Sequence, residues 1–564
     1  MDYKKSIANL IKVEGVTNEE IESMIAFPKD LTMGDYCLPC FRFSAKLRKS
    51  PVVIADELAS SIDTSSVDFL EKVESVAGYL NFTLDKTRYA SKILGKILSD
   101  GEKYGHSDIG AGKTVCIDYS SVNIAKPFHI GHLSTTVIGA ALYRIYKALG
   151  YNVVGINHLG DWGTQFGKLI SAFKRWGDKE DIEKRGIKAL FEIYVRFHAE
   201  EKVNPELAKE GRYWFKKIED GDKEATELFA FFREVTLKDV EKLYDRLGVK
   251  FDSYCGESFY NDKMDPVLCD LEQKGLLVES DGAKVVNLDE YGMPPCLLVK
   301  ADGATLYATR DMAAAFYRKK TYDFDKCLYV VAYQQNLHFK QWFKVIELMG
   351  EEWYKDLIHV AFGMVSLEDG AMSTREGRVV FLEEVLDKAV EKAQKIIAEK
   401  NPNLEGKELI SEQVGVGAVI FSALCNNRIK DIVFNFDKVL NFDGETAPYI
   451  QYTVARCNSV IEKAGQTGVE PNYKGVTDGI GAELINMLSR FGDIVQDSAK
   501  KNEPSLVTRY LLGVSALYNK FYFEFKIITE DKGVQQARTM LTDATRTVLK
   551  NGLALLGIAS PERM

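Results

Sequence analysis

The sequence contains no hydrophobic run long enough to cross a membrane. No stretch approaches the roughly 18 consecutive apolar residues that a transmembrane helix needs. The first residues, MDYKKSIANLIKVEG, also lack the apolar segment of a secretory signal peptide. We therefore expect a soluble protein that remains in the cytoplasm and binds no membrane.

Cysteine is scarce and irregularly spaced. Nine cysteines lie among 564 residues, and this odd number without regular spacing excludes a disulfide framework. Only Cys37 and Cys40 form a Cys-x-x-Cys pair. A structural zinc site would need a second pair of ligands nearby, which the sequence does not offer. We expect reduced, mostly buried thiols and no metal site.

An excess of positive charge is also absent. The 73 Lys and Arg residues are outnumbered by 82 Asp and Glu, which gives a net charge of −9. This balance excludes a protein that holds nucleic acid by bulk positive charge, but not a local patch, because phosphate contacts need only a few well-placed cations. With 46% hydrophobic and 27% charged residues the composition is typical of globular proteins. The length suggests roughly three or four domains.

A strand–helix–strand unit follows the first hundred residues. The run TVCIDYS at 114–120 is typical of a buried strand, and residues 131–149 carry an apolar stripe with the helical repeat. Gly150 stands where the end of a helix favours glycine, and 152–157 predicts the next strand. This pattern predicts a parallel sheet with a right-handed crossover.

The rest of the chain divides by pattern. The first hundred residues mix helical patterns with strand-like runs such as VAGYLNFTL. Residues from about 172 to 285 are charged and helical, which indicates an insertion. After about 381 the pattern is helical to the end, with one helix beginning behind Pro504. Between these parts, three strand-like runs resume the α/β pattern: CLLVK, KCLYVVAY and HVAFGMV.

Histidines gather in the segment SSVNIAKPFHIGHL and just after it. Three of the seven lie within 30 residues, at His129, His132 and His158. Pro127 can begin a helix, so we expect the first two in its first turn and on one face. A helix N-terminus offers free N–H groups to an anion, and Gly131 leaves room for a ligand to approach the backbone. Taken alone, His-x-x-His also fits chance, core packing or a metal pair.

The wider string resembles a known family. The letters HIGH at 129–132 resemble the signature of class I aminoacyl-tRNA synthetases. DYSSVNIAKPFHIGHL followed by GINHLGDWGTQFGKL resembles, more narrowly, arginyl-tRNA synthetases. Further similar segments follow in family order over nearly the whole chain: GDYCLP, GYLNF at 78–82, LYATRDMAAAFYR at 306–318, AMSTREG at 371–377, APYIQYTVAR at 447–456 and LLGIASPERM.

The resemblance implies both a fold and a reaction. The fold class is α/β: a Rossmann-type parallel-sheet catalytic domain with an N-terminal α+β domain and a C-terminal all-helical anticodon-binding domain. We expect a tRNA-contacting domain at 1–108, the catalytic domain at 109–400 and the anticodon-binding domain at 401–564. The reaction activates L-arginine with ATP to arginyl-adenylate and transfers it to the 3′-terminal ribose of arginine tRNA. We expect ATP as a substrate with Mg²⁺ as its counter-ion, no tightly bound cofactor, and a monomer. In this family, activation of the amino acid waits for tRNA.

The resemblance also assigns an ATP site. Its signature loop normally contributes two lysines in the form KMSKS, but here the loop reads AMSTR at 371–375, without either lysine. Arg375 is displaced by one residue, and Lys126 is the other candidate, because the family places a lysine there when the loop is degenerate. Ser134 stands where the family usually has arginine. We expect catalysis by Lys126, His129, His132 and Arg375, and ATP binding by Lys126, His129, Gly131, His132, Met372, Ser373 and Arg375.

The substrate arginine requires carboxylates and polar acceptors, because its guanidinium stays protonated and presents a planar set of donors. Asp311 lies four residues after Tyr307, so a helix would place them on one face. His158 and Asp161 are expected near the site, with roles left open. The arginine-binding residues implied by the resemblance are Asp118, Asn123, Tyr307, Asp311 and Gln335.

For the tRNA, the resemblance points to Tyr449, Gln451, Tyr452 and Arg456. Aromatic side chains stack on single-stranded bases and arginine binds phosphate. Packing in a helical core is the alternative for each of these residues.

Two alternatives to an active ligase remain open from the sequence. One is a catalytically impaired paralogue that binds tRNA or arginine, suggested by Ser134 and the altered loop at 371–375. The other is a nucleotidyltransferase with the HIGH motif that adenylates a small metabolite without RNA, against which the long helical C-terminus argues.

Overall fold

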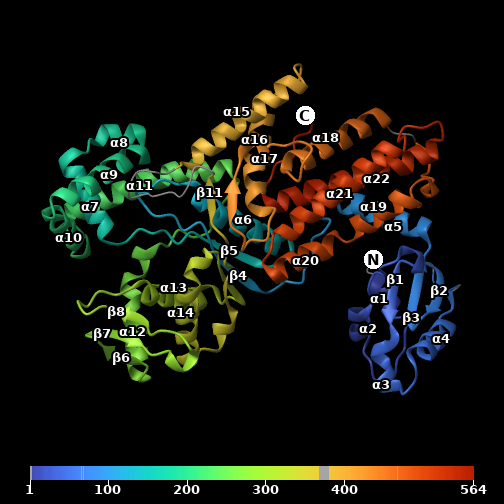
Figure 1. Cartoon of the computed structure of the whole chain (residues 1–564), viewed down its shortest axis with the longest axis horizontal. Coiled ribbons are helices and arrows are strands. Elements are labelled where there is room, and N and C mark those ends of the chain that lie inside the picture. Colours follow the sequence, from blue (N-terminus) through green and yellow to red (C-terminus); the bar gives the residue numbers. More distant parts are fainter. Residues whose placement is uncertain (1–2, 65–66, 68, 368–379, 466–467) are drawn as a thin grey trace. The chain divides into compact units, whose positions relative to one another are not determined.

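The computed structural model describes residues 3–64, 67, 69–367, 380–465 and 468–564. They form two compact units (Figure 1). One contains Met1–Tyr104, Val460–Ser489 and Leu517–Thr547, and the other contains Gly105–Ser459, Arg490–Ala516 and Val548–Met564. Three long C-terminal helices contribute residues to both units: α18 (Ala447–Ala464), α21 (Ser505–Glu524) and α22 (Lys532–Leu556). No helix of the described parts is long and apolar enough to cross a membrane.

The first unit is built on an antiparallel sheet of order β1-β3-β2, drawn in blue in Figure 1. A tight turn joins β2 to β3, with Ala77 and Gly78 both at positive φ. The predicted mixture of helices and strands is confirmed, including a strand within VAGYLNFTL. The elements are α1 (Tyr3–Ala8), α2 (Asn18–Met24), β1 (Tyr36–Pro39), α3 (Ser44–Leu47), α4 (Pro51–Ser61), β2 (Leu70–Val76), β3 (Tyr79–Leu84), α5 (Lys86–Asp100) and α19 (Gly479–Ser489).

A parallel sheet of order β10-β9-β4-β5 forms the centre of the second unit. Its strands are β4 (Thr114–Asp118), β5 (Asn152–Ile156), β9 (Lys326–Tyr329) and β10 (Leu357–His359). Helix α6 (Leu133–Ala148) connects β4 to β5, and Gly150 behind it has φ 82°. The predicted βαβ unit is confirmed. Because β4 lies between β5 and β9, the strand order reverses beside its carboxyl end, where sheets of this kind bind ligands.

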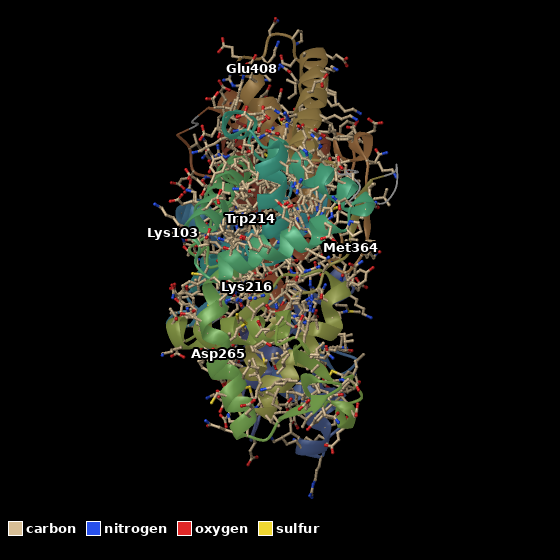
Figure 2. The ribbon with its side chains drawn as sticks, turned by 90° about the vertical axis from the view of Figure 1, so that its left-hand side faces the viewer. Lys103, Trp214, Lys216, Asp265, Met364 and Glu408 are labelled. Atoms are coloured by element: carbon tan, nitrogen blue, oxygen red, sulfur yellow. The ribbon has the colours of Figure 1, made fainter. Side chains whose placement is uncertain are left out.

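The helical character expected for about 172–285 is confirmed as far as α12, but the end of this range forms strands. The helices of the insertion are α7 (Thr164–Trp176), α8 (Lys179–Arg185), α9 (Ile187–Val203), α10 (Glu206–Glu219), α11 (Lys223–Arg246) and α12 (Met264–Gln273). Figure 2 labels Trp214 and Lys216 on α10. The Nζ atom of Lys174 on α7 lies 4.8 Å from the centroid of the Trp214 ring, so a cation–π contact ties these two helices together.

One predicted strand belongs to a different sheet from the one expected. The run CLLVK forms β8 (Cys296–Val299), but β8 pairs antiparallel with β7 (Ala283–Val286), which pairs with β6 (Leu277–Ser280). Antiparallel neighbours need only a short connection, whereas joining the parallel sheet requires a crossover. The other two runs supply β9 and the region of β10 and β11 (Val365–Leu367), as predicted.

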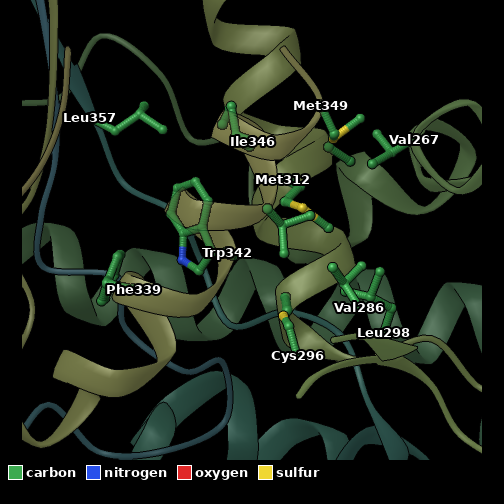
Figure 3. Close-up of a cluster of buried hydrophobic side chains, with 14 of the residues drawn as sticks. Val267, Val286, Cys296, Leu298, Met312, Phe339, Trp342, Ile346, Met349 and Leu357 are labelled. Atoms are coloured by element: carbon green, nitrogen blue, oxygen red, sulfur yellow. The ribbon is translucent and has the colours of Figure 1, made fainter. Parts of the chain in front are cut away.

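A hydrophobic core supports α13 (Tyr307–Tyr322) and α14 (Asn336–Leu348) (Figure 3). Met312 of α13 and Trp342 of α14 are fully buried in it, together with Cys296 of β8. These contacts fix α13, which carries the predicted residues Tyr307 and Asp311, and α14, which directly follows Gln335. Most cysteines are buried, as expected.

The chain after 381 is helical as predicted, apart from the short strand β12 (Ile432–Phe434), which pairs parallel with β11. Pro504 directly precedes α21. The remaining helices are α15 (Leu382–Lys400), α16 (Lys407–Leu424), α17 (Phe436–Val439) and α20 (Phe491–Lys501).

Candidate active site

The HIGH segment begins the helix that follows β4, but not at the predicted residue. Pro127 lies outside the helix, and the first turn is the 3-10 segment Ile130–His132, which continues into α6. His129 is the N-cap: its Nδ1 accepts from the Gly131 N–H at 3.1 Å, and its own N–H donates to Nδ1 of His132 at 3.2 Å. These reciprocal bonds satisfy N–H groups at the helix start, which explains why the helix begins there.

Both imidazoles are uncharged at neutral pH. Burial, and then the positive charge of Lys126, lowers the pKa of His129 to about 4. Burial lowers the pKa of His132 well below its ordinary value, with His129 and Lys126 adding to the effect. The two ring centroids are 3.9 Å apart. The histidines therefore offer neutral hydrogen-bonding groups at the helix N-terminus, and Lys126 supplies the positive charge.

The loop between β4 and Lys126 has an unusual backbone. Ser120, Ser121 and Ala125 have φ values of 69°, 48° and 61°. Non-glycine residues in this region cost about 1–3 kcal/mol each and persist only where surrounding contacts fix them. Such strain is a feature of functional sites, and here it directly precedes Lys126.

Asp118, at the carboxyl end of β4, already has a cationic partner. Its Oδ2 accepts from Nη2 of Arg318 at 2.8 Å, and its Oδ1 accepts from the Ser121 hydroxyl at 2.7 Å. Arg318 is 1% exposed. Burial acts to lower the pKa of Arg318, but Asp118, together with Tyr260, Tyr329 and Cys327, acts to raise it, and the pKa is raised well above its ordinary value. The charge of Asp118 is therefore balanced by the protein itself.

Asp311 lies one turn into α13, as predicted, on the helix that begins at Tyr307. Its Oδ2 is 2.6 Å from Nε2 of His338 in the first turn of α14. Both side chains keep about a quarter of their surface exposed. Tyr307 is 65% exposed, and Gln335 is an exposed residue just before α14. Asp311 thus presents a partly accessible carboxylate that one imidazole orients.

Asn123 lies where the loop after β4 meets the chain after β5. The N–H of Ile124 donates to the Gly160 carbonyl at 3.1 Å, and the Gly160 N–H donates to the Val122 carbonyl at 2.9 Å. A Cβ atom on Gly160 would lie 2.2 Å from the side-chain oxygen of Asn123. Only glycine at 160 therefore accommodates this position of Asn123.

His158 is influenced electrostatically by both predicted carboxylates, Asp118 and Asp311. Its imidazole is 3.4 Å from Nη2 of Arg318. Burial lowers the pKa of His158, while the charges of Asp118, Asp311 and Asp161 act to raise it. These carboxylates, far apart in sequence, therefore all act on the charge of one imidazole. Asp161 is itself buried and accepts from the backbone N–H and the hydroxyl of Ser258, each at 2.9 Å.

A polar cavity of about 620 Å³ opens beside these residues. Its lining includes Lys126 from the predicted ATP set and Tyr307 from the predicted arginine set. Glu257 and Arg310 also line it, and Nη1 of Arg310 lies 3.5 Å from Oε2 of Glu257. Burial raises the pKa of Glu257 to about 7, although Arg310 acts to lower it, and Asp311 and Asp161 add to the rise. Further aromatic and cationic side chains also line the cavity: Trp162, Tyr194, Phe215, Lys168 and Lys300.

The signature loop lies outside the described residues. Met372, Ser373 and Arg375 all fall within 368–379. The residues just after this loop lie beside the HIGH segment: the N–H of Ile130 donates to the Val380 carbonyl at 3.2 Å, and the N–H of Leu382 donates to the Phe128 carbonyl at 2.9 Å.

The residues predicted to bind tRNA share α18 but differ in burial. Tyr452 is 41% exposed, and the Arg456 guanidinium lies 5.0 Å from its ring centroid. Tyr449 is half-buried. Gln451 is fully buried, and its amide donates to the carbonyls of Gln413 and Ala559 at 3.1 and 2.7 Å.

Sequence reasoning missed four charged or titratable residues of the site: Glu257, Arg310, Arg318 and His338. Two of them lie inside the quoted segment LYATRDMAAAFYR. Helical spacing from Asp311 could have indicated that Arg318 is two turns further along the same helix. Glu257 and His338 carry no local signal.

Together these features define the catalytic core of a class I aminoacyl-tRNA synthetase: a parallel sheet, HIGH at the start of the helix after its central strand β4, and a polar cavity lined by Lys126 from the loop between them. Three family models match the chain. They are the arginyl-tRNA synthetase N-terminal domain at 1–84, the catalytic domain of class I (R) tRNA synthetases at 93–436, and the DALR anticodon-binding domain at 450–564. The chain belongs to the arginyl-tRNA synthetase family.

Individual relatives agree with this assignment. The arginine–tRNA ligase of Clostridioides difficile (strain 630) is 53% identical over 566 residues, and that of Alkaliphilus metalliredigens (strain QYMF) is 50% identical; each comparison covers 100% of both chains. The arginyl-tRNA synthetase of Thermus thermophilus superposes with a TM-score of 0.80 at 25% identity, over 96% of each chain. The full-length match and the anticodon-binding domain favour an active ligase over the impaired paralogue and the RNA-free nucleotidyltransferase.

Proposed function

We propose that the chain ligates L-arginine to its tRNA in two steps at this cavity. The carboxylate of arginine attacks the α-phosphorus of ATP, the bond to pyrophosphate breaks, and arginyl-adenylate forms. A hydroxyl of the 3′-terminal ribose then attacks the activated carbonyl, and AMP leaves. Both steps depend on positioning and on stabilising the negative charge that develops. Mg²⁺ arrives as the counter-ion of the ATP phosphates.

Asp311 carries the selectivity for arginine in this proposal. Asp118 is balanced by Arg318 at 2.8 Å, whereas Asp311 faces an imidazole and remains partly exposed. A guanidinium that enters the site therefore finds its anionic partner in Asp311. Tyr307 begins the same helix, and Asn123, Gln335 and the second oxygen of Asp118 supply polar contacts to the rest of the amino acid.

Lys126 carries the positive charge toward the ATP phosphates. The imidazoles of His129 and His132 contribute neutral hydrogen bonds at the helix N-terminus, beside Gly131, and the nucleotide lies against them. Arg375 adds charge from the loop at 371–375, with Met372 and Ser373 beside it. Lys126 is the more important cation, because Arg375 is displaced from the signature position.

The tRNA is bound by two further parts of the chain. Tyr452 and Arg456 offer an aromatic face and a cation to single-stranded bases, with Tyr449 beside them, while Gln451 supports this surface from inside. We retain 1–108, 109–400 and 401–564 as the tRNA-contacting, catalytic and anticodon-binding divisions. The protein acts as a monomer.

One observation carries the proposal: Lys126 and Tyr307, from the separate ATP and arginine sets, line the same cavity. Pyrophosphate exchange with arginine, lysine and citrulline, each with ATP and total tRNA, tests it. Citrulline has the shape of arginine without its charge, so exchange with arginine alone is expected. Equal exchange with citrulline would contradict the assignment of Asp311.

A further inference from the structure

Helix α11 of the insertion lies against the strained loop that carries Lys126. The loop turns through Ser120, Ser121 and Ala125, all with positive φ. Non-glycine residues avoid this region because Cβ then crowds the backbone, so the loop needs external contacts to keep its shape. Two buried side chains of α11, Thr236 and Tyr244, provide such contacts.

The contact of Thr236 is directional. Its hydroxyl donates to the Phe232 carbonyl at 2.8 Å within α11, which leaves its oxygen to accept from the Ala125 N–H at 3.1 Å. Ala125 has φ 61° and directly precedes Lys126. The bond therefore fixes the peptide between Ile124 and Ala125, one residue before Lys126.

The contact of Tyr244 fixes the other end of the loop. Its phenol oxygen is 2.7 Å from the Ser120 hydroxyl and accepts from the Asn157 amide at 2.9 Å. From the opposite side, Thr135 of α6 accepts from the Ser120 N–H at 3.1 Å. The loop is thus held between the helix of the HIGH segment and a helix of the insertion.

We propose that Thr236 and Tyr244 are positioning residues for Lys126, so that α11 sets the geometry of adenylate formation without touching a substrate. This inference rests on the proposed role of Lys126. Small misplacements of a group that stabilises a transition state lower the rate of the chemical step, and one ångström can cost about 10²-fold. Binding of ATP or arginine in the ground state depends less on such placement.

The test measures pyrophosphate exchange in the presence of arginine tRNA. Thr236→Val keeps the shape but removes the acceptor, and we expect kcat to fall about 10- to 100-fold with little change in KM for ATP or arginine. Thr236→Ser restores the hydroxyl and should recover most of the rate. Tyr244→Phe is an independent variant at the other end of the loop and should lower kcat in the same way.

Thr545→Val is the matched control. Thr545 is fully buried on α22, and its hydroxyl makes the same bond within the helix, to the Leu541 carbonyl at 2.8 Å. Losing a buried threonine hydroxyl is therefore common to both variants, whereas only Thr236 accepts from the loop before Lys126. Thr545→Val should exchange pyrophosphate at the wild-type rate.

A double-mutant cycle with Lys126→Ala separates the inference from the proposed function. Lys126→Ala alone should lower the rate roughly 10²- to 10³-fold, the size expected for losing one charge-stabilising group. In that background Thr236→Val should have no further effect. If the two effects multiply, Thr236 does not act through Lys126 and the inference fails. If Lys126→Ala alone leaves the exchange rate unchanged, the proposed role of Lys126 fails, and the inference fails as well.

Discussion

At the residue scale, the site combines groups whose charge the protein neutralises with two charges that we propose act on the substrates. Asp118 is paired with buried Arg318, and the two histidines of the HIGH segment are neutral because burial depresses their pKa values. Lys126 and Asp311 are the charges that we propose meet the phosphates and the guanidinium. Each substrate then finds one main ionic partner of opposite sign.

Asp311→Asn tests the pocket. The substitution keeps the shape but removes the charge opposite the guanidinium, and breaking a buried ion pair costs about 3–5 kcal/mol. Because Asp311 is partly exposed, we expect a loss near the lower end, about 10²-fold in kcat/KM for arginine. KM for ATP should change little. Steady-state arginylation at varied arginine and varied ATP measures both. An unchanged kcat/KM for arginine would place the guanidinium elsewhere.

Glu257 predicts a pH dependence of stability. Its pKa is raised from 4.5 to about 7 in the folded chain. Between these values the folded state holds a proton that the unfolded state has released. The contribution of Glu257 to stability is therefore fully present below about pH 4.5, falls as the pH rises, and is lost above about pH 7.

Glu257→Gln removes this titration, and thermal unfolding of both proteins at pH 5 and pH 8 measures the effect. The melting temperature of the variant relative to wild type should be higher at pH 8 than at pH 5. If the melting temperatures of variant and wild type differed by the same amount at both pH values, the carboxyl of Glu257 would ionise normally in the folded state.

At the scale of the elements, helices prepare the site more than the sheet does. The parallel strands place Asp118, but α6 and α11 hold the loop before Lys126, and α13 and α14 bring Asp311 to His338. The core in Figure 3 supports the last pair, because the next residues, Met312 and Phe339, are buried in it. Substitutions in helix contacts that lie away from the substrates should therefore alter catalysis.

Adjacent residues of α18 should have opposite phenotypes. Gln451→Leu removes the donor to the Gln413 and Ala559 carbonyls, and leaving buried carbonyls unpaired should lower the free energy of unfolding by about 1–3 kcal/mol. Tyr452→Ala removes an exposed ring and should weaken tRNA binding by about 1–3 kcal/mol, the value of one stacked base, with unfolding unchanged. Both variants are measured by thermal unfolding and by tRNA titration, so each variant serves as the control for the other. If Tyr452→Ala lowered stability and left tRNA binding unchanged, Tyr452 would not belong to the RNA-binding surface.

Local patterns predicted the elements well, and long-range contacts explain what they missed. The strand at β4, the helix α6 and the left-handed Gly150 follow from signals within a few residues. The start of the HIGH helix was predicted at Pro127, because the caps made by two histidine side chains leave no trace in a propensity pattern. The pair Asp118–Arg318 spans 200 residues, and no spacing rule connects them.

At the scale of the whole molecule, two further domains accompany the catalytic domain. The family models cover an N-terminal domain at 1–84 and an anticodon-binding domain at 450–564 in addition to the catalytic domain. The signature loop lacks both lysines, so we expect the nucleotide site to be only fractionally competent before tRNA binds. A shift from about 1% to 99% competent needs roughly 5.5 kcal/mol of differential affinity, which an extended RNA contact can supply.

This predicts that amino-acid activation depends on tRNA. Pyrophosphate exchange with arginine and ATP alone should be negligible, and it should become robust when arginine tRNA is added. Treating the tRNA with ribonuclease beforehand is the control. Robust exchange in RNA-free enzyme would show that the site is assembled without tRNA, and would leave the ligase assignment intact.

The most direct test of the central claim is a charging assay with the purified protein, ATP, radiolabelled arginine and total tRNA. The account predicts that acid-precipitable arginine rises until the arginine-accepting tRNA is consumed, and that omitting ATP abolishes it. tRNA that binds the protein but stays uncharged, under conditions where Thermus thermophilus arginyl-tRNA synthetase charges its own tRNA, would contradict the account.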